Sequence, residues 1–170
     1  MRTVVIGLGN PVRADDAVGL HVARGVRERL SRRVAAATAP EAPGTRRRCC
    51  DVEELWAGGL RLVEAMSGYD RAILVDALST REVAPGAIRR LPLEALGPCS
   101  TVTCAHDTSL PTALRMWREA GVPVPREITV FGIGAADLAT LTERLTPAVA
   151  AAVPLAVEAV LAEVDVEAHP

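Results

Sequence analysis

Three side chains that could share one site lie at or beyond the ends of apolar runs: Asp16, Asp76 and His106. Asp76 directly follows the run Ala72 to Val75, and Asp16 follows a short loop after the run Thr3 to Gly7. Two carboxylates and one imidazole form a mixed oxygen and nitrogen ligand set, which suits a borderline divalent metal such as zinc or nickel. If the fold brings them together, they make a candidate metal-contacting catalytic site.

Each of these residues also has a structural interpretation. Asp15 or Asp16 can cap the helix that follows, since a carboxylate at a helix start accepts backbone N–H groups, and one of the pair can cap while the other points outward. Asp76 can cap a turn, and His106 can be a solvated loop histidine. We expect the remaining two histidines to face solvent, one on the polar face of the first helix and one in the C-terminal tail: His21 and His169.

The elements that must position these residues follow from the apolar pattern. We expect strands at 3–7, about 47–53, 72–75, about 87–91 and 127–133, and helices after Asp16 and at 59–67 and 109–119. A C-terminal helix at about 147–164 begins at Thr146-Pro147, and Pro154 should kink or split it. Alternating strands and helices predict an α/β fold, a single three-layer helix-sheet-helix domain with a mostly parallel five-stranded sheet.

This architecture gives Asp16, Asp76 and His106 a common location. In open α/β sheets, ligands bind beyond the carboxyl ends of the strands, where the strand order reverses. Asp16 and Asp76 both follow such strand ends, and His106 precedes the third helix, so it can reach the same edge. We expect one domain over residues 1–170, with a surface loop at about 31–45.

Composition excludes several classes of function. All 19 basic residues are arginine, so P-loop phosphate binding, Schiff-base chemistry and a Ser-Lys nucleophile are absent. The net charge of -2 gives no basic field for nucleic acid. The amino terminus lacks secretory-signal features, and the longest apolar stretch is about half of the roughly 20 residues that span a bilayer, so we expect a cytoplasmic protein without a membrane span.

The cysteines are expected to be free thiols. Cys49-Cys50 and the interval from Cys99 to Cys104 do not match zinc-site spacings. Cys104-Ala105-His106 could also suggest a thiol nucleophile, an interpretation that we do not favour.

Other motifs give only weak support for alternative functions. Gly7-x-Gly9 hints at a dinucleotide site, but Val12 occupies the third glycine position and phosphate would meet Asp15-Asp16. Gly7 to Pro11 also resembles the start of peptidyl-tRNA hydrolase, whose Asn-His element is missing. Neither a Gly-x-Ser-x-Gly elbow nor a His-Glu-x-x-His helix occurs.

The ordered motifs resemble one family. Val5 to Asn10 and Asp15 to Gly19 are similar to the amino-terminal motif of the NiFe-hydrogenase maturation endopeptidases. Further similarity extends in order along the chain, through Glu54 to Val63, Ile73 to Ala77, Ala84 to Gly86, His106 and Leu145 to Pro147. Two departures stand out: Leu55 to Gly59 replaces a Gly-Gly-Thr-rich turn, and Ser31 to Thr45 looks like extra length.

The resemblance implies an aspartic-type endopeptidase that removes a C-terminal extension from a hydrogenase large-subunit precursor after nickel insertion. It carries the catalytic and metal-contacting roles over to Asp16, Asp76 and His106. The expected partner is the nickel-loaded precursor, which supplies the nickel, with no permanently bound organic cofactor and a monomer favoured. The alternative is a noncatalytic nickel-binding chaperone that uses the same ligands.

Overall fold

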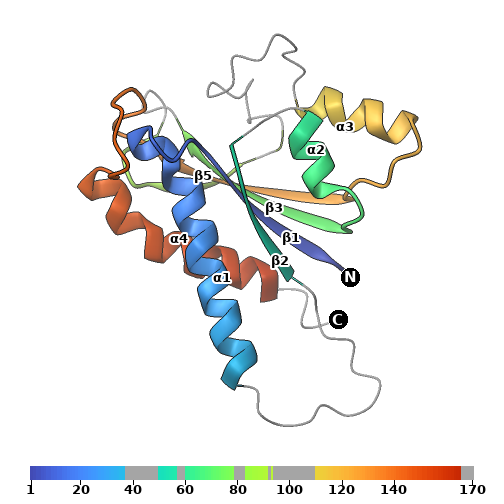
Figure 1. Ribbon diagram of the computed structural model, residues 1–170, viewed down its shortest axis with the longest axis horizontal. Coiled ribbons are helices and arrows are strands. Elements are labelled where there is room, and N and C mark those ends of the chain that lie inside the picture. The colour runs from blue at the N-terminus through green and yellow to red at the C-terminus, as the bar shows by residue number, and fades with distance from the viewer. Residues whose placement is uncertain (37–49, 57–59, 79–82, 92, 94–109, 166–170) are drawn as a thin grey trace.

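The computed structural model describes residues 1–36, 50–56, 60–78, 83–91, 93 and 110–165 (Figure 1). Within these residues, five strands form one sheet in the order β2-β1-β3-β5-β4. Neighbouring strands are parallel except β4, which pairs antiparallel with β5. The strands are β1 (Thr3–Leu8), β2 (Cys50–Leu55), β3 (Arg71–Leu78), β4 (Ile88–Leu91) and β5 (Glu127–Gly134). The predicted α/β fold class is confirmed.

Helices cover both faces of the sheet (Figure 1). Side chains alternate between the faces of a strand, so Val5 and Ile73 pack toward one side while Val4 and Leu74 pack toward the other. The first core contains α1 (Val18–Ala36) and α4 (Pro147–Asp165), and the second contains α2 (Leu60–Met66) and α3 (Leu110–Glu119). The described residues therefore form the three predicted layers.

The strand order reverses beside β1. The chain moves from β1 outward to β2, then returns to place β3 on the other side of β1. Pairing of β1 with β3 ends at Gly7 and Val75, whereas β3 stays paired with β5 up to Leu78. Asp76 is therefore not the end of its strand, as the apolar run had indicated, but it lies one residue past the last residue of β3 that pairs with β1.

Helix α1 corrects the predicted loop at 31–45. The helix continues to Ala36, so residues 31–36 are helical, and residues 37–45 lie outside the described part of the chain. Arg32 contacts Glu28 one turn earlier at 2.6 Å, and Arg33 contacts Asp165 of α4 at 2.9 Å. These ion pairs and the absence of a helix breaker before Ala36 explain the longer helix.

Helix α4 is continuous through Pro154, so the proline does not split it. By length and composition this helix could cross a membrane, and a third of its most apolar window is buried inside the protein. Its inner face, which includes Val149, Val157 and Val160, lies in the core with α1 and the sheet. Packing in the domain core accounts for the apolar side chains of this inner face.

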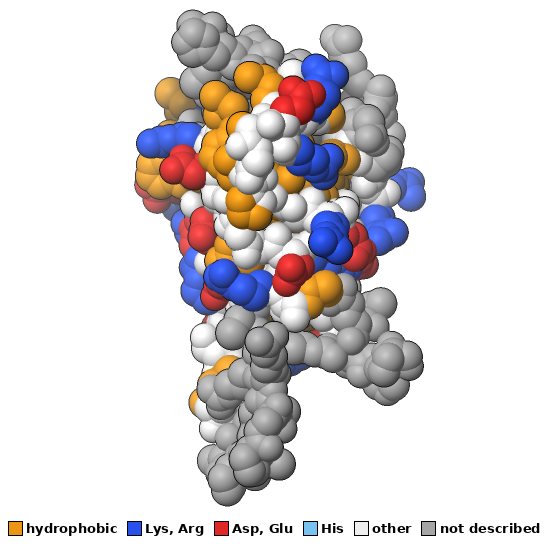
Figure 2. Space-filling model, turned by 90° about the vertical axis from the view of Figure 1, so that its right-hand side faces the viewer, with side chains coloured by type: hydrophobic (Ala, Val, Ile, Leu, Met, Phe, Trp, Pro, Cys, Tyr) orange, Lys and Arg blue, Asp and Glu red, His pale blue; other side chains and the backbone are white. Residues whose placement is uncertain are grey.

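The surface carries both signs of charge. On the face seen in Figure 2, Arg side chains and Asp or Glu side chains are interspersed rather than gathered by sign. Mixed charge of this kind creates no strong field of one sign over that face.

Candidate active site

Asp16 belongs to a tight turn that follows β1. The turn is the 3-10 helix η1 (Ala14–Ala17), which leads directly into α1. The backbone N–H of Asn10 donates to Oδ2 of Asp16 at 2.8 Å. Gly9 has φ +141°, and a Cβ at this position would lie 1.8 Å from the carbonyl oxygen of Asp16. Only glycine allows the loop to close this tightly, so the sequence Gly9-Asn10 fixes Asp16 against the end of β1.

Asp76 reaches the same place from β3. Its backbone pairs with Gly132 of β5, and η1 packs against β3 on the side that β1 has left. Oδ1 of Asp76 accepts a hydrogen bond from the N–H of Ala77 at 2.8 Å. The fold thus brings two of the three predicted residues, Asp16 and Asp76, to the carboxyl edge at the strand-order reversal.

The two carboxylates influence each other electrostatically. Burial raises the pKa of Asp76 to about 7, against the hydrogen bond from Ala77, and the charge of Asp16 raises it further. Burial also raises the pKa of Asp16, while the hydrogen bond from Asn10 and the charge of Arg13 lower it. Near neutral pH Asp76 is therefore partly protonated, and a cation entering the site would favour its ionised form.

Asp15 has a different role from its neighbour. Its side chain is fully buried and accepts hydrogen bonds from Ala136, Asp137 and Thr146, all in the segment between β5 and α4. Neither carboxylate caps the helix that follows it, although the local sequence pattern allowed this. The carboxylate of Asp15 accepts from residues 136–146, and that of Asp16 accepts from the N–H of Asn10.

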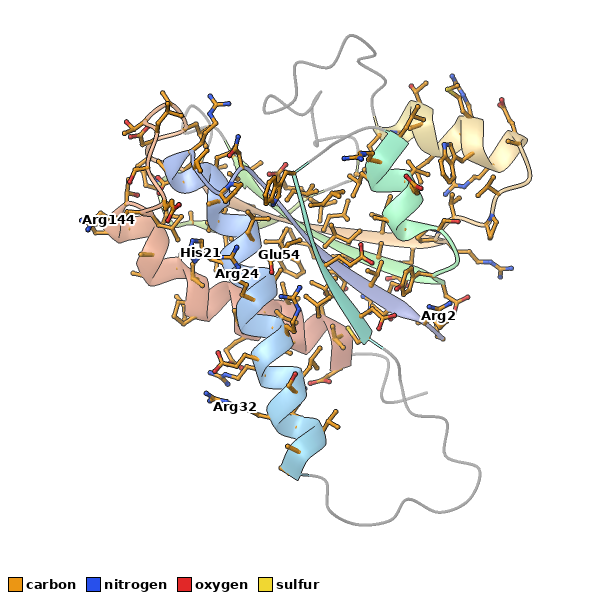
Figure 3. The ribbon with its side chains drawn as sticks, viewed as in Figure 1. Arg2, His21, Arg24, Arg32, Glu54 and Arg144 are labelled. Atoms are coloured by element: carbon orange, nitrogen blue, oxygen red, sulfur yellow. The ribbon has the colours of Figure 1, made fainter. Side chains whose placement is uncertain are left out.

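The third predicted residue, His106, lies outside the described residues, as does His169. Within the described ranges, no three His, Cys, Asp or Glu side chains gather in a group that could hold a metal. His21 is half-buried rather than solvent-facing, and Figure 3 shows it beside Arg24 and Glu54, where α1 crosses β2. Burial and the charge of Arg24 lower the pKa of His21, and Glu54 opposes them.

Trp56 is one of the residues that replace the Gly-Gly-Thr-rich turn of the family, and it is exposed. Trp56 directly follows β2 and is 67% exposed, and the carbonyl of its neighbour Leu55 accepts from the N–H of Gly9 at 3.2 Å. Trp56 therefore follows the residue whose backbone joins β2 to the loop that carries Asn10. Exposed aromatic rings are favourable contacts for a protein partner.

The sequence did not indicate that Thr146 contacts Asp15, the neighbour of the site residue Asp16. Its hydroxyl donates to Oδ2 of Asp15 at 2.9 Å, although 131 positions separate the two residues. The only sequence signal was the motif Leu145 to Pro147, which had been interpreted as a helix start.

Paired carboxylates at the point where the strand order of a three-layer α/β sheet reverses define a candidate hydrolase site. The chain belongs to the hydrogenase maturation protease family, whose family model matches residues 50–163. Hydrogenase 2 maturation protease of Escherichia coli is 30% identical over 174 residues, which span all of this chain and 96% of that protein. The resemblance stated from the motifs is thus confirmed, and the chain is an endopeptidase of hydrogenase maturation.

Solved structures agree with this membership. The hydrogenase maturating endopeptidase HybD from E. coli has a TM-score of 0.69 and 25% identity, with 99% of this chain and 94% of that chain covered. A [NiFe] hydrogenase maturation protease from Thermococcus kodakarensis, at 22% identity, shares the fold with a TM-score of 0.61, over 94% of this chain and 97% of that chain.

Proposed function

We propose that this endopeptidase removes the C-terminal extension of a NiFe-hydrogenase large-subunit precursor after nickel insertion, in the cytoplasm and as a monomer. In this proposal the nickel is part of the substrate, and Asp16, Asp76 and His106 contact it. The observation that carries the proposal is the electrostatic coupling of Asp16 and Asp76 at the edge where β1 leaves the sheet.

The raised pKa of Asp76 supports a cation that arrives with the substrate. Two nearby carboxylates in a desolvated place repel each other when both are ionised, and a divalent cation removes that cost. Carboxylate and imidazole ligands also suit nickel. The site would therefore discriminate a nickel-loaded precursor from an empty one by charge.

The same residues can carry out the hydrolysis. Nickel held at the site can polarise the scissile carbonyl or lower the pKa of a bound water. In the nickel-loaded complex, one of the two carboxylates accepts a proton from that water. This assignment makes the reaction aspartic-type, with a carboxylate as the general base.

Substoichiometric enzyme separates this proposal from a noncatalytic nickel chaperone. Incubated with an excess of nickel-loaded precursor, an endopeptidase converts all of it to a shorter chain, which intact mass detects. A chaperone that uses the same ligands would leave the precursor mass unchanged.

Three substitutions test the site residues. We expect Asp16→Asn, Asp76→Asn and His106→Ala each to abolish cleavage while circular dichroism shows a folded protein. Asp51→Asn is the matched control, because Asp51 lies near the opposite end of β2, where it accepts from Tyr69. Near-normal cleavage by Asp76→Asn would overturn the assignment.

A further inference from the structure

Asp15 is a buried carboxylate with a full set of donors. The N–H groups of Ala136 and Asp137 donate to Oδ2 at 2.8 and 3.0 Å, and the N–H of Thr146 donates to Oδ1 at 2.6 Å. The hydroxyl of Thr146 adds a fourth bond, to Oδ2, at 2.9 Å. Burial of a charge is tolerated only where hydrogen bonds replace water, and here all four come from one segment far along the chain.

That segment ends at a helix start. Thr146 immediately precedes Pro147, the first residue of the 19-residue helix α4. The positive end of a helix dipole favours a nearby carboxylate. Proline is suited to the first helical position because it has no N–H group that would need an acceptor there. Asp15 is therefore anchored to a rigid element that also packs against α1 and the sheet.

Backbone bonds reinforce the same attachment. The N–H of Ala14 donates to the carbonyl of Thr142 at 2.8 Å, and the N–H of Asp15 donates to the carbonyl of Asp137 at 3.0 Å. Asp16 is the next residue in η1, so its backbone position is set by these bonds on one side. On its other side, the carboxylate of Asp16 accepts the hydrogen bond from the N–H of Asn10, and the N–H of Asp16 donates to the carbonyl of Arg13 at 2.9 Å.

We propose that Asp15 and Thr146 form a clamp that positions Asp16 against Asp76, and that the rate of cleavage depends on it. Asp15 is thus a positioning residue, which acts through Asp16. This inference rests on the proposed function. Misplacing a reacting group by about 1 Å can cost on the order of 100-fold in rate, so a loosened clamp has a large effect without any change in the substrate contacts.

Thr146 offers a matched set of variants. Thr146→Val keeps the shape but removes the hydroxyl, and we expect kcat to fall about tenfold with KM little changed, because a bond to a charged group is lost. Thr146→Ser should restore the rate. Ser67→Ala is the control, because Ser67 lies just before the start of β3, away from Asp15, and its hydroxyl donates to the carbonyl of Pro123, so the rate should equal that of the wild type. Asp15→Asn should cost about 100-fold.

Hydrogen exchange of the Asn10 amide separates positioning from simple loss of fold. This amide is bonded to Asp16, so in Thr146→Val and Asp15→Asn it should exchange faster while amides of β3 stay protected. Normal kcat in folded Thr146→Val, or a rate that falls only with the folded fraction, would overturn the clamp. The proposed function fails if the wild-type enzyme cleaves no precursor. The clamp is tested separately: unchanged exchange of the Asn10 amide in both variants would refute it, whatever the activity of the enzyme.

Discussion

Asp76→Asn should stabilise the folded protein at neutral pH while destroying its activity. Burial holds the pKa of Asp76 at about 7 in the folded protein, compared with 3.8 for an ordinary aspartate. Below pH 3.8 both folded and unfolded chains are protonated there, so Asp76 costs nothing. As the pH rises toward 7, the unfolded chain ionises first and stability falls.

The size of this cost follows from the shift. About three pKa units at about 1.36 kcal/mol each give roughly 4 kcal/mol as an upper limit, reached at and above pH 7. Asparagine keeps an Oδ1 that can accept from the N–H of Ala77, so the substitution removes the charge without removing the hydrogen bond.

Urea unfolding of both proteins from pH 4 to pH 8 measures the effect. The stability gain of Asp76→Asn should be near zero at pH 4 and grow until about pH 7. Asp137→Asn is a control of opposite sign, because hydrogen bonds from Thr140 and Ala139 lower the pKa of the exposed Asp137. That variant should lose stability across this whole pH range, because the contribution of a lowered pKa disappears only below the ordinary value of 3.8, as the pH falls through the pKa of the folded protein. A gain for Asp76→Asn that does not change with pH would refute the reasoning.

Three further predictions concern the framework. Glu163→Ala should cost about 1.5–3 kcal/mol in urea unfolding, because it removes one carboxylate that contacts the buried Arg71, while Glu127 and the backbone carbonyl of residue 163 still contact it. Glu158→Ala on the same helix removes an exposed ion pair and should cost at most about 1 kcal/mol, so equal losses would contradict the account. Gly19→Ala would put a Cβ 2.3 Å from the carbonyl oxygen of Leu8, and we expect a loss above about 4 kcal/mol, which a wild-type melting temperature would contradict. Burial raises the pKa of Cys50 to about 11, so peptide mass mapping should show slow alkylation at pH 8 in the folded protein and fast alkylation in urea; equal rates would disprove the burial.

The sheet was predictable because its signals are local. β1 and β3 are apolar runs buried on both faces, and the position of Asp76 beyond such a run indicated the correct edge of the sheet. The true end of β3 was not predictable from that run. Residues after Asp76 stay in the strand because β5 continues beside them, and pairing of this kind is not encoded in the local pattern.

The sequence also could not show that Asp15 bonds to a distant segment while Asp16 faces the candidate site. Both residues fit a helix start equally well, and the donors that bury Asp15 lie more than 120 positions away. The length of α1 was missed for a related reason, since its last turn is held partly by Asp165 of α4. Long-range contacts decided each point.

Cleavage of matched precursors tests the central claim most directly. Wild-type enzyme and Asp76→Asn are each incubated with the large-subunit precursor, with and without nickel, and the products are weighed by intact mass. Wild-type enzyme should shorten only the nickel-loaded precursor, and Asp76→Asn should shorten neither. Equal cleavage of the nickel-free precursor by wild-type enzyme, or normal cleavage by Asp76→Asn, would contradict a site in which Asp16 and Asp76 contact substrate-borne nickel.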